Sequence, residues 1–369
     1  MSGVGSSVQV AGRVVRHDSR LRSAATQKIL TFGALIGLFI VFTLASPYFL
    51  TFDNVMGILL ATTVNGVLAL GATFVIITAG IDLSVGTVMT LSAVMAAEFV
   101  TNWGLPVYLG LLGGVLTGAL AGFANGITIS KMKVPPFVAT LGVMMAAKGL
   151  SLVIAHSKPI YFAQDSIVRG LTMNSVVGSV IPGLDIPNAI FYLFGAAIIA
   201  SLILGKTILG RYAFAIGSNE EATRLSGVNV DFWKTAVYTL CGVFSGLGGV
   251  IIASRLNSAQ PALGAGYELD AIAAVVIGGT SLSGGEGTIL GTVIGAFIMS
   301  VLTNGLRILS VAQEWQLVVT GGIVIVAVYA DMLRRRQQQG RILLEGGDQA
   351  VAQPPGPERE QHADVSAGG

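Results

Sequence analysis

The side chains best suited to chemistry in this sequence are polar residues set inside long apolar stretches. Asp82 is the clearest of them, because no charged residue stands between it and Asp53. An acid in such a setting either caps the helix that follows, a task that Ser84 could share, or serves a pathway for a polar solute or an ion. The two roles are compatible. The candidate pathway residues are Asn65, Asp82, Ser84, Asn125 and Asn304.

The sequence lacks the residue sets that catalysis or metal binding would need. Its histidines are scattered and Cys241 is its only cysteine, so no nucleophile-base pair and no metal-ligand spacing can be drawn. Gly205-Lys206-Thr207 resembles the end of a phosphate-binding loop, but Ala200 stands where that loop needs its first glycine. The Leu-Ser-Gly-Gly-Glu stretch 282–286 lies between apolar runs and is interpreted as a turn. We therefore expect no enzyme, no cofactor in this chain and no nucleic-acid partner.

The composition indicates an all-α, polytopic membrane protein. Of its 369 residues, 53% are hydrophobic and 11% are charged, whereas soluble domains carry about 25% charged residues. The run 268–280 is too short for an ordinary span and predicts a half-helix or re-entrant segment. We predict about ten transmembrane helices in lipid, from the apolar runs 29–50, 55–79, 84–101, 105–130, 134–155, 188–209, 235–254, 268–280, 288–309 and 312–332.

Charge placement predicts the orientation and the domain organisation. An even number of spans puts both termini on one side, and Lys and Arg concentrate in the segments assigned to that side. The positive-inside rule makes that side cytoplasmic. We expect a basic cytoplasmic tail over 1–28, a transmembrane domain over 29–335 with a cytoplasmic loop at 206–234, and a disordered cytoplasmic tail over 336–369.

Two stretches of the chain resemble each other. Asn125-Gly126 precedes Thr140 at nearly the same spacing at which Asn304-Gly305 precedes Thr320. In the predicted topology, the first Asn-Gly pair lies at an inner span end and the second toward an outer one. This pattern predicts a possible inverted repeat of five plus five spans, which is a common transporter plan.

Residues 206–234 form a polar island between two apolar runs. Ser218 can cap a short helix there, and Glu221 three residues later would complete a capping box. Gly227 can end that helix in the left-handed conformation, which glycine adopts without strain. A membrane protein that holds a short capped helix between two spans is expected to present it to a partner.

The residues of this predicted helix suit such a role. The acidic pair Glu220 and Glu221 lies at the helix end where the backbone dipole is positive. Ala222 and Leu225 are three residues apart and share a face. A short helix held by two spans can pass rigid-body motion from a partner into the membrane.

The phrase Glu-Ala-Thr-Arg-Leu-Ser-Gly at 221–227 resembles the cytoplasmic E-A-A-x-x-x-G loop of ATP-binding cassette (ABC) importer permeases. Thr223 replaces the second alanine of that motif, and the downstream I-x-L-P element of some permeases is missing. The stretches 79–86, 134–142, 276–287 and 304–322 are similar to the ribose-type branch of monosaccharide permeases. The resemblance covers about residues 30–335.

The resemblance implies a bacterial inner-membrane permease that imports a monosaccharide. Its partners would be an ATPase that binds ATP and Mg²⁺, an extracytoplasmic sugar-binding protein and a second permease copy, identical or related. The resemblance implies coupling to the ATPase through Ser218, Glu220, Glu221, Ala222, Arg224, Leu225 and Gly227.

An ion-coupled secondary transporter of a small polar solute is the alternative. Such a protein would use buried acids as proton or ion sites, and only Asp82 approaches that description. The capped helix in the island would then have no explanation. A membrane-embedded enzyme would need titratable groups that converge near one interface, and none are evident.

Overall fold

The computed structural model describes residues 31–163, 167–329 and 332–333. The predicted tails, 1–28 and 336–369, lie outside the described residues. The elements are a helix Thr31–Ala45, α2 (Phe52–Ile77), α3 (Val85–Ala97), a π-helical turn η1 (Glu98–Asn102), α4 (Val107–Ser130), α5 (Pro136–Ile154), β1 (Ile160–Tyr161), α6 (Ile167–Met173), α7 (Val176–Val180), α8 (Ala189–Lys206), α9 (Ile208–Ser218), α10 (Glu220–Leu225), α11 (Val230–Leu256), β2 (Ser258–Ala259), α12 (Tyr267–Ile277), α13 (Ile289–Ile308) and a helix Gln313–Tyr329.

The all-α prediction is confirmed, and the prediction of about ten spans is confirmed for seven of them and stays a prediction for the rest. Each of the ten apolar runs contains a helix, but only seven helices in the described residues are long and apolar enough to cross a membrane. They are α2, α3 continued by η1, α4, α5, α8, α11 and α13. Three helices are shorter: Thr31–Ala45, α12 and Gln313–Tyr329. Of these, only α12 was predicted to be short.

Close packing of α4 on α11 holds the centre of the bundle together. Glycine recurs at every fourth position of α4 from Gly110 to Gly126 and faces neighbouring helices. A β-carbon on Gly118 or Gly122 would collide with the backbone of α11 near Gly242. Small residues at this spacing let two helix backbones approach closely, which favours helix association in a membrane.

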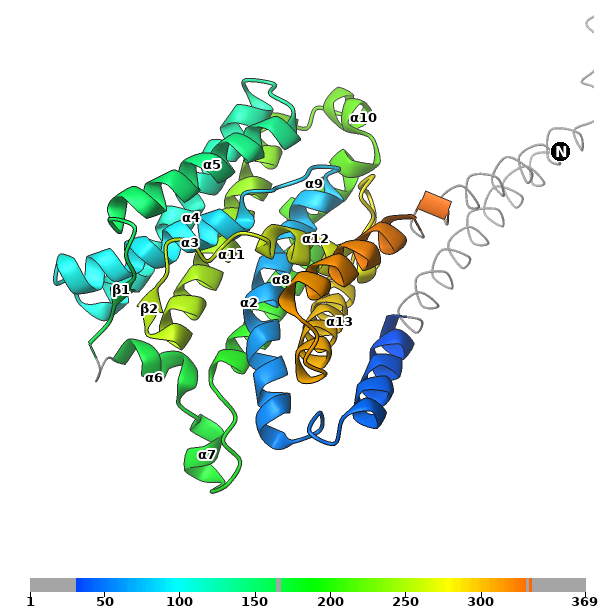
Figure 1. Cartoon of the computed structure of the whole chain (residues 1–369). Coiled ribbons are helices and arrows are strands. Elements are labelled where there is room, and N and C mark those ends of the chain that lie inside the picture. The colour runs from blue at the N-terminus through cyan, green and yellow to red at the C-terminus, as the bar shows by residue number, and fades with distance from the viewer. Residues whose placement is uncertain (1–30, 164–166, 330–331, 334–369) are drawn as a thin grey trace, which may run out of the picture.

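The two ends of the bundle differ (Figure 1). The short helix α10 lies at one end, at the top of the view, and α6 and α7 lie at the other. The small antiparallel pair of β1 and β2 joins Ile160 to Ala259, just past the last turn of α11. The helix Thr31–Ala45 packs against α13 through Phe42, beside Val301 and Leu302. The main core lies between α2, α3, α11, α12 and α13.

The two Asn-Gly pairs lie toward opposite ends of the bundle. Asn125 is near the end of α4 whose following turn carries Lys133, which pairs with Asp231 beside α10. Asn304 is near the far end of α13, whose first turn packs against Gly278 and the loop next to Ile77. An inverted repeat would need this placement; the repeat itself stays a prediction.

Candidate functional site

The start of α10 lies one residue later than the sequence predicted. Asn219 is the N-cap: its backbone is extended (φ −160°, ψ 102°) and its Oδ1 accepts a hydrogen bond from the Ala222 backbone N–H at 2.9 Å. The predicted cap at Ser218 is wrong, because Ser218 is the last residue of α9. Serine and asparagine cap helices about equally well, so the choice depends on where α9 ends.

The end of α10 is as predicted, and its outer face is open. Gly227 follows the last turn with φ +84°, and its N–H donates to the carbonyl of Arg224 at 3.0 Å. Glu221, Ala222 and Leu225 are exposed, with Leu225 at 82%. Thr223 is buried, so the residue that departs from the family motif faces inward rather than toward a partner.

Ion pairs hold α10 against the helices beneath it. Glu220 bonds the ammonium group of Lys234 on α11 at 2.6 Å and the guanidinium group of Arg224 at 3.1 Å. Arg224 also reaches Asp231 at 3.4 Å, and Asp231 bonds Lys133 at 2.8 Å. Partial burial raises the pKa of Glu220, but the hydrogen bonds and charges of Lys234 and Arg224 outweigh it. The pKa of this carboxyl therefore lies below its ordinary value.

The turn between α9 and α10 rests on two loops that lead into the core. Gly217 lies against the carbonyl oxygen of Ile77, where α2 ends. That carbonyl also accepts the N–H of Gly285 at 2.9 Å. Gly284 and Gly285 have positive φ angles of 79° and 75°, a conformation that glycine adopts at little cost. The turn that leads into α10 thus contacts the end of α2 and the loop before α13.

Three predicted pathway residues meet in one buried cluster. Asp82 Oδ1 accepts the Ser84 backbone N–H at 2.9 Å and the Ser84 hydroxyl at 2.6 Å. The Asn125 amide donates to Ser84 Oγ at 2.9 Å, which ties the loop to α4. All three residues are buried. Neither Asp82 nor Ser84 caps α3 through its side chain. The cluster joins the loop before α3 to the α4–α11 pair; its part in a pathway stays a prediction.

The other two predicted pathway residues lie elsewhere. Asn65, in the middle of α2, lies near the carboxylate of Asp270 on α12, which packs against α2. Asn304 donates to Asn54 Oδ1 at 2.9 Å, at the end of the bundle away from α10. Asp270 was missed in the sequence, although an acid inside the short apolar run 268–280 was the signal that could have identified it.

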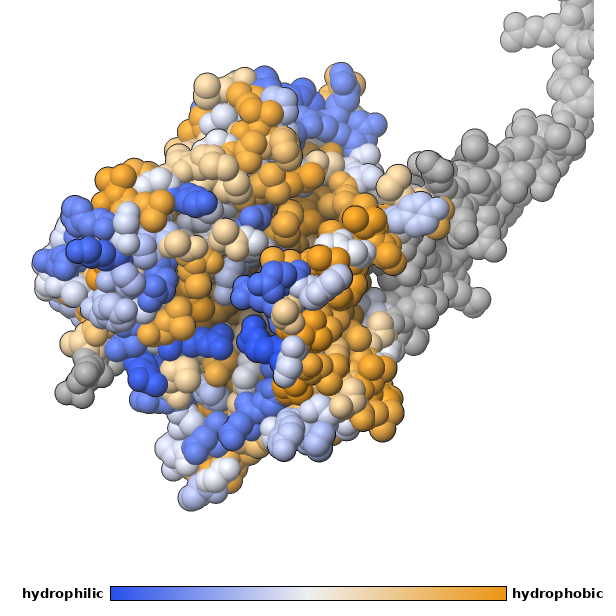
Figure 2. Space-filling model, in the orientation of Figure 1, coloured by the Kyte–Doolittle hydropathy of each residue, from blue (hydrophilic) through white to orange (hydrophobic). Residues whose placement is uncertain are grey.

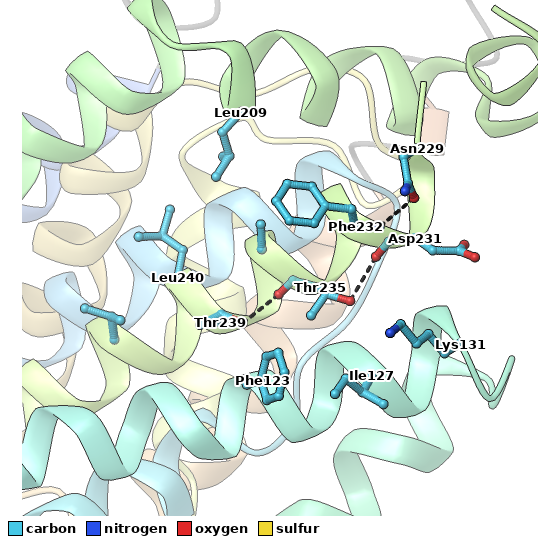
Figure 3. Close-up of a pocket in the computed structure, with 12 residues that line it drawn as sticks. Phe123, Ile127, Lys131, Leu209, Asn229, Asp231, Phe232, Thr235, Thr239 and Leu240 are labelled. Atoms are coloured by element: carbon cyan, nitrogen blue, oxygen red, sulfur yellow. Dashed lines mark hydrogen bonds between the residues drawn. The ribbon is translucent and has the colours of Figure 1, made fainter. Parts of the chain in front are cut away.

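A groove of about 720 Å³ runs between α4 and α11 near Leu209 of α9 (Figure 3). Its walls are mainly apolar, with Phe123 and Leu240 among them. The hydroxyls of Thr235 and Thr239 donate to carbonyls of their own helix at 2.9 Å and 2.8 Å. These two hydroxyls therefore use their donors within α11, and the remaining charged or amide lining comes from Lys131, Asn229 and Asp231.

Comparison with known proteins gives a consistent picture. The family model described as "Branched-chain amino acid transport system / permease component" matches residues 54–328. The chain is 42% identical over 304 residues to the ribose import permease of Haemophilus influenzae, covering 82% of this chain and 92% of that protein. It is 43% identical to the ribose import permease of Bacillus subtilis (83% and 92% covered) and 38% identical to the D-allose transport permease of Escherichia coli K12 (82% and 91%). No solved structure matches the chain.

The family match includes α10, the buried cluster and the seven candidate spans except the first two residues of α2, and the helix Thr31–Ala45 lies before it. It confirms the expectation of a multi-pass transport component rather than an enzyme. The chain belongs to the family described as the permease component of branched-chain amino acid transport systems, and it is similar over most of its length to ribose import permeases.

Proposed function

We propose that this chain is the membrane-spanning permease of an ATP-driven ABC importer for a monosaccharide of the ribose type. Relatives named as ribose, D-allose, fructose and xylose permeases support the substrate class. The observation that carries the proposal is α10, a capped helix whose exposed face includes Glu221 and Leu225. A helix of this form serves as a docking element for a partner.

The proposed coupling runs from α10 into the membrane core. Motion of α10 would act on Gly217, which contacts the carbonyl of Ile77, and on Gly285, which is bonded to the same carbonyl. Ile77 ends α2, and Gly285 is in the loop that leads into α13. A rigid-body shift of α10 therefore reaches two membrane-embedded helices without crossing flexible chain.

The partners follow from the same proposal. An ATPase would dock on α10 from the cytoplasm and bind ATP and Mg²⁺, while this chain binds no nucleotide. A sugar-binding protein would deliver substrate at the opposite end of the bundle, and a second permease copy, identical or related, would complete the pathway. The chain would then lie in a bacterial inner membrane with both termini cytoplasmic.

The test is purification of the tagged protein from its own host in mild detergent, followed by mass spectrometry. We expect a stoichiometric ATPase with a complete phosphate-binding loop, and its loss in a Glu221→Lys variant. Val180→Lys, at an exposed position of α7 at the other end, should retain the ATPase. Recovery of the wild-type chain without an ATPase, with ion-driven uptake abolished by Asp82→Asn, would instead support the ion-coupled transporter.

A further inference from the structure

The first half of α2 carries a stripe of exposed or partly exposed residues, which ends at Asn65. Partly exposed residues recur on this helix through Ala61 and Asn65, whereas every residue from Gly66 to Ile77 is buried. At about 1.5 Å per residue, Asn65 lies roughly 20 Å from one end of α2 and roughly 18 Å from the other. The surface along α2 is therefore open from the end away from α10 and closes near mid-membrane depth.

The accessible surface of the short helix α12 ends at the same level as that of α2. Tyr267 and Asp270 are partly exposed, whereas residues 273–276 are buried. The Asn65 side chain lies near the Asp270 carboxylate where α2 packs against α12, and within the described residues Asn65 Oδ1 is buried and accepts no hydrogen bond. The closed end of the stripe is thus made of a carboxylate, an amide with a spare acceptor and a neighbouring tyrosine.

Two arginines lie near Tyr267, at the ends of α11 and α13 that are away from α10. Arg255 is in the last turn of α11 and Arg307 in the last turn of α13, and both interact electrostatically with Tyr267. Neither makes an ion pair within the described part of the chain. Figure 2 shows that, on the side of the molecule in view, hydrophilic side chains gather around a hollow between hydrophobic areas.

A surface of this kind does not suit contact with lipid. Charged and amide side chains at membrane depth are costly against hydrocarbon, and they face a water-filled cavity or another protein surface instead. Asn65 and Asp270 are partly exposed at that depth. The stripe must therefore face water or a second chain, which is the setting of a transport pathway.

We propose that Asn65, Tyr267 and Asp270 form the station at which the pathway holds a polyhydroxylated substrate, reached from the end of the bundle opposite α10. The carboxylate accepts hydrogen bonds from two sugar hydroxyls, and the amide N–H group can donate to another. The tyrosine ring provides an apolar surface for the C–H face of the sugar. This inference rests on the proposed function and names the residues that would select its substrate.

The test measures uptake and ATP hydrolysis together in proteoliposomes that contain the permease, its ATPase and its binding protein. Ribose and 2-deoxyribose are each supplied at concentrations that saturate the binding protein. Sites that hydrogen-bond a substrate hydroxyl strongly reject an analogue that lacks it, so the wild type should prefer ribose. In Asp270→Asn, ribose uptake should fall by about tenfold or more and the preference should shrink. ATP hydrolysis stimulated by the loaded binding protein should stay within about twofold of wild type.

Asp53→Asn makes the same change at the exposed start of α2 and should leave the uptake of both sugars unchanged. Asn65→Ala provides a second comparison if Asp270→Asn does not yield a folded complex. Wild-type uptake and preference in the station variant would overturn the proposal. Equal losses of uptake and stimulated ATP hydrolysis would also overturn it, by assigning Asp270 to coupling. A wild-type complex that imports neither sugar would contradict the proposed function itself.

Discussion

Gly217, in the last turn of α9, lies so close to the carbonyl oxygen of Ile77 that a β-carbon on Gly217 would collide with it. The same carbonyl accepts the N–H of Gly285. Three chain segments therefore meet at one backbone atom beneath α10. Because backbone cannot move aside as a flexible side chain can, this contact is the least tolerant point between α10 and the core.

Gly217→Ala should break this contact and weaken coupling. Forcing an extra methyl group into packed structure costs about 1–3 kcal/mol, and here the turn or the end of α2 must shift. We expect sugar uptake to fall by about tenfold or more in proteoliposomes with the ATPase bound. Gly205→Ala is the matched control, because a β-carbon at Gly205 of α8 meets nothing within 4 Å. Unchanged uptake in Gly217→Ala would show that α10 does not act through Ile77.

Asn219→Ala should loosen α10, whereas Ser218→Ala should not. Loss of an N-cap costs about 1 kcal/mol, which is about a fivefold change in a local opening equilibrium. Hydrogen exchange of the Ala222 amide, the proton that Asn219 binds, should accelerate by that factor. The exposed side chain of Ser218 caps nothing in the described structure. A larger effect from Ser218→Ala than from Asn219→Ala would instead support the capping box of Ser218 and Glu221 that the sequence predicted.

Leu225→Gln should weaken ATPase binding without affecting the fold. Leu225 is 82% exposed, so its removal takes little from the core of the isolated permease. Apolar anchors at the centre of an interface contribute about 2 kcal/mol or more, which corresponds to about 30-fold in affinity. Titration of the purified ATPase onto the permease would measure this. Val180→Gln removes an equally apolar side chain, 76% exposed, at the opposite end, and should leave the affinity unchanged.

The sequence predicted elements whose causes are local. The stop at Gly227 follows from one residue's freedom to adopt a positive φ, which the structure has at 84°. The shortness of α12 follows from the length of one apolar run. The cap was predicted at Ser218 but is at Asn219, because α9 continues through Ser218, and its last turn contacts Ile77, far away in the sequence.

The candidate site depended on long-range packing in the same way. The meeting of Asp82, Ser84 and Asn125 requires the loop before α3 to pack on α4, over a separation of about 40 residues. The pairing of Asn65 with Asp270 spans α2 and α12. Residue type identified most of these polar groups individually, but only the fold shows that they divide into a closed cluster and a partly open pair.

Acidification should release α10 from α11. The pKa of Glu220 is lowered in the folded protein, so its ion pairs with Lys234 and Arg224 contribute stability at pH values above its ordinary pKa of 4.5. This contribution is lost as the pH falls through the lowered folded-state pKa, because the unfolded segment then binds the proton more readily. The stabilising effect is therefore constant near neutral pH and declines below about pH 4.5.

Trp233 can report this release, because its ring lies 5.0 Å from that of Tyr212 of α9 and it precedes Lys234. In a Trp103→Phe, Trp315→Phe background, Trp233 fluorescence should change as the pH is lowered below 4.5, with a midpoint under that value. Glu220→Gln removes the titrating group, so its fluorescence should be flat over the same range and should resemble that of the acidified parent. A titration that persists in Glu220→Gln would assign the change to another carboxyl, such as Asp231, which bonds Lys133 and Arg224.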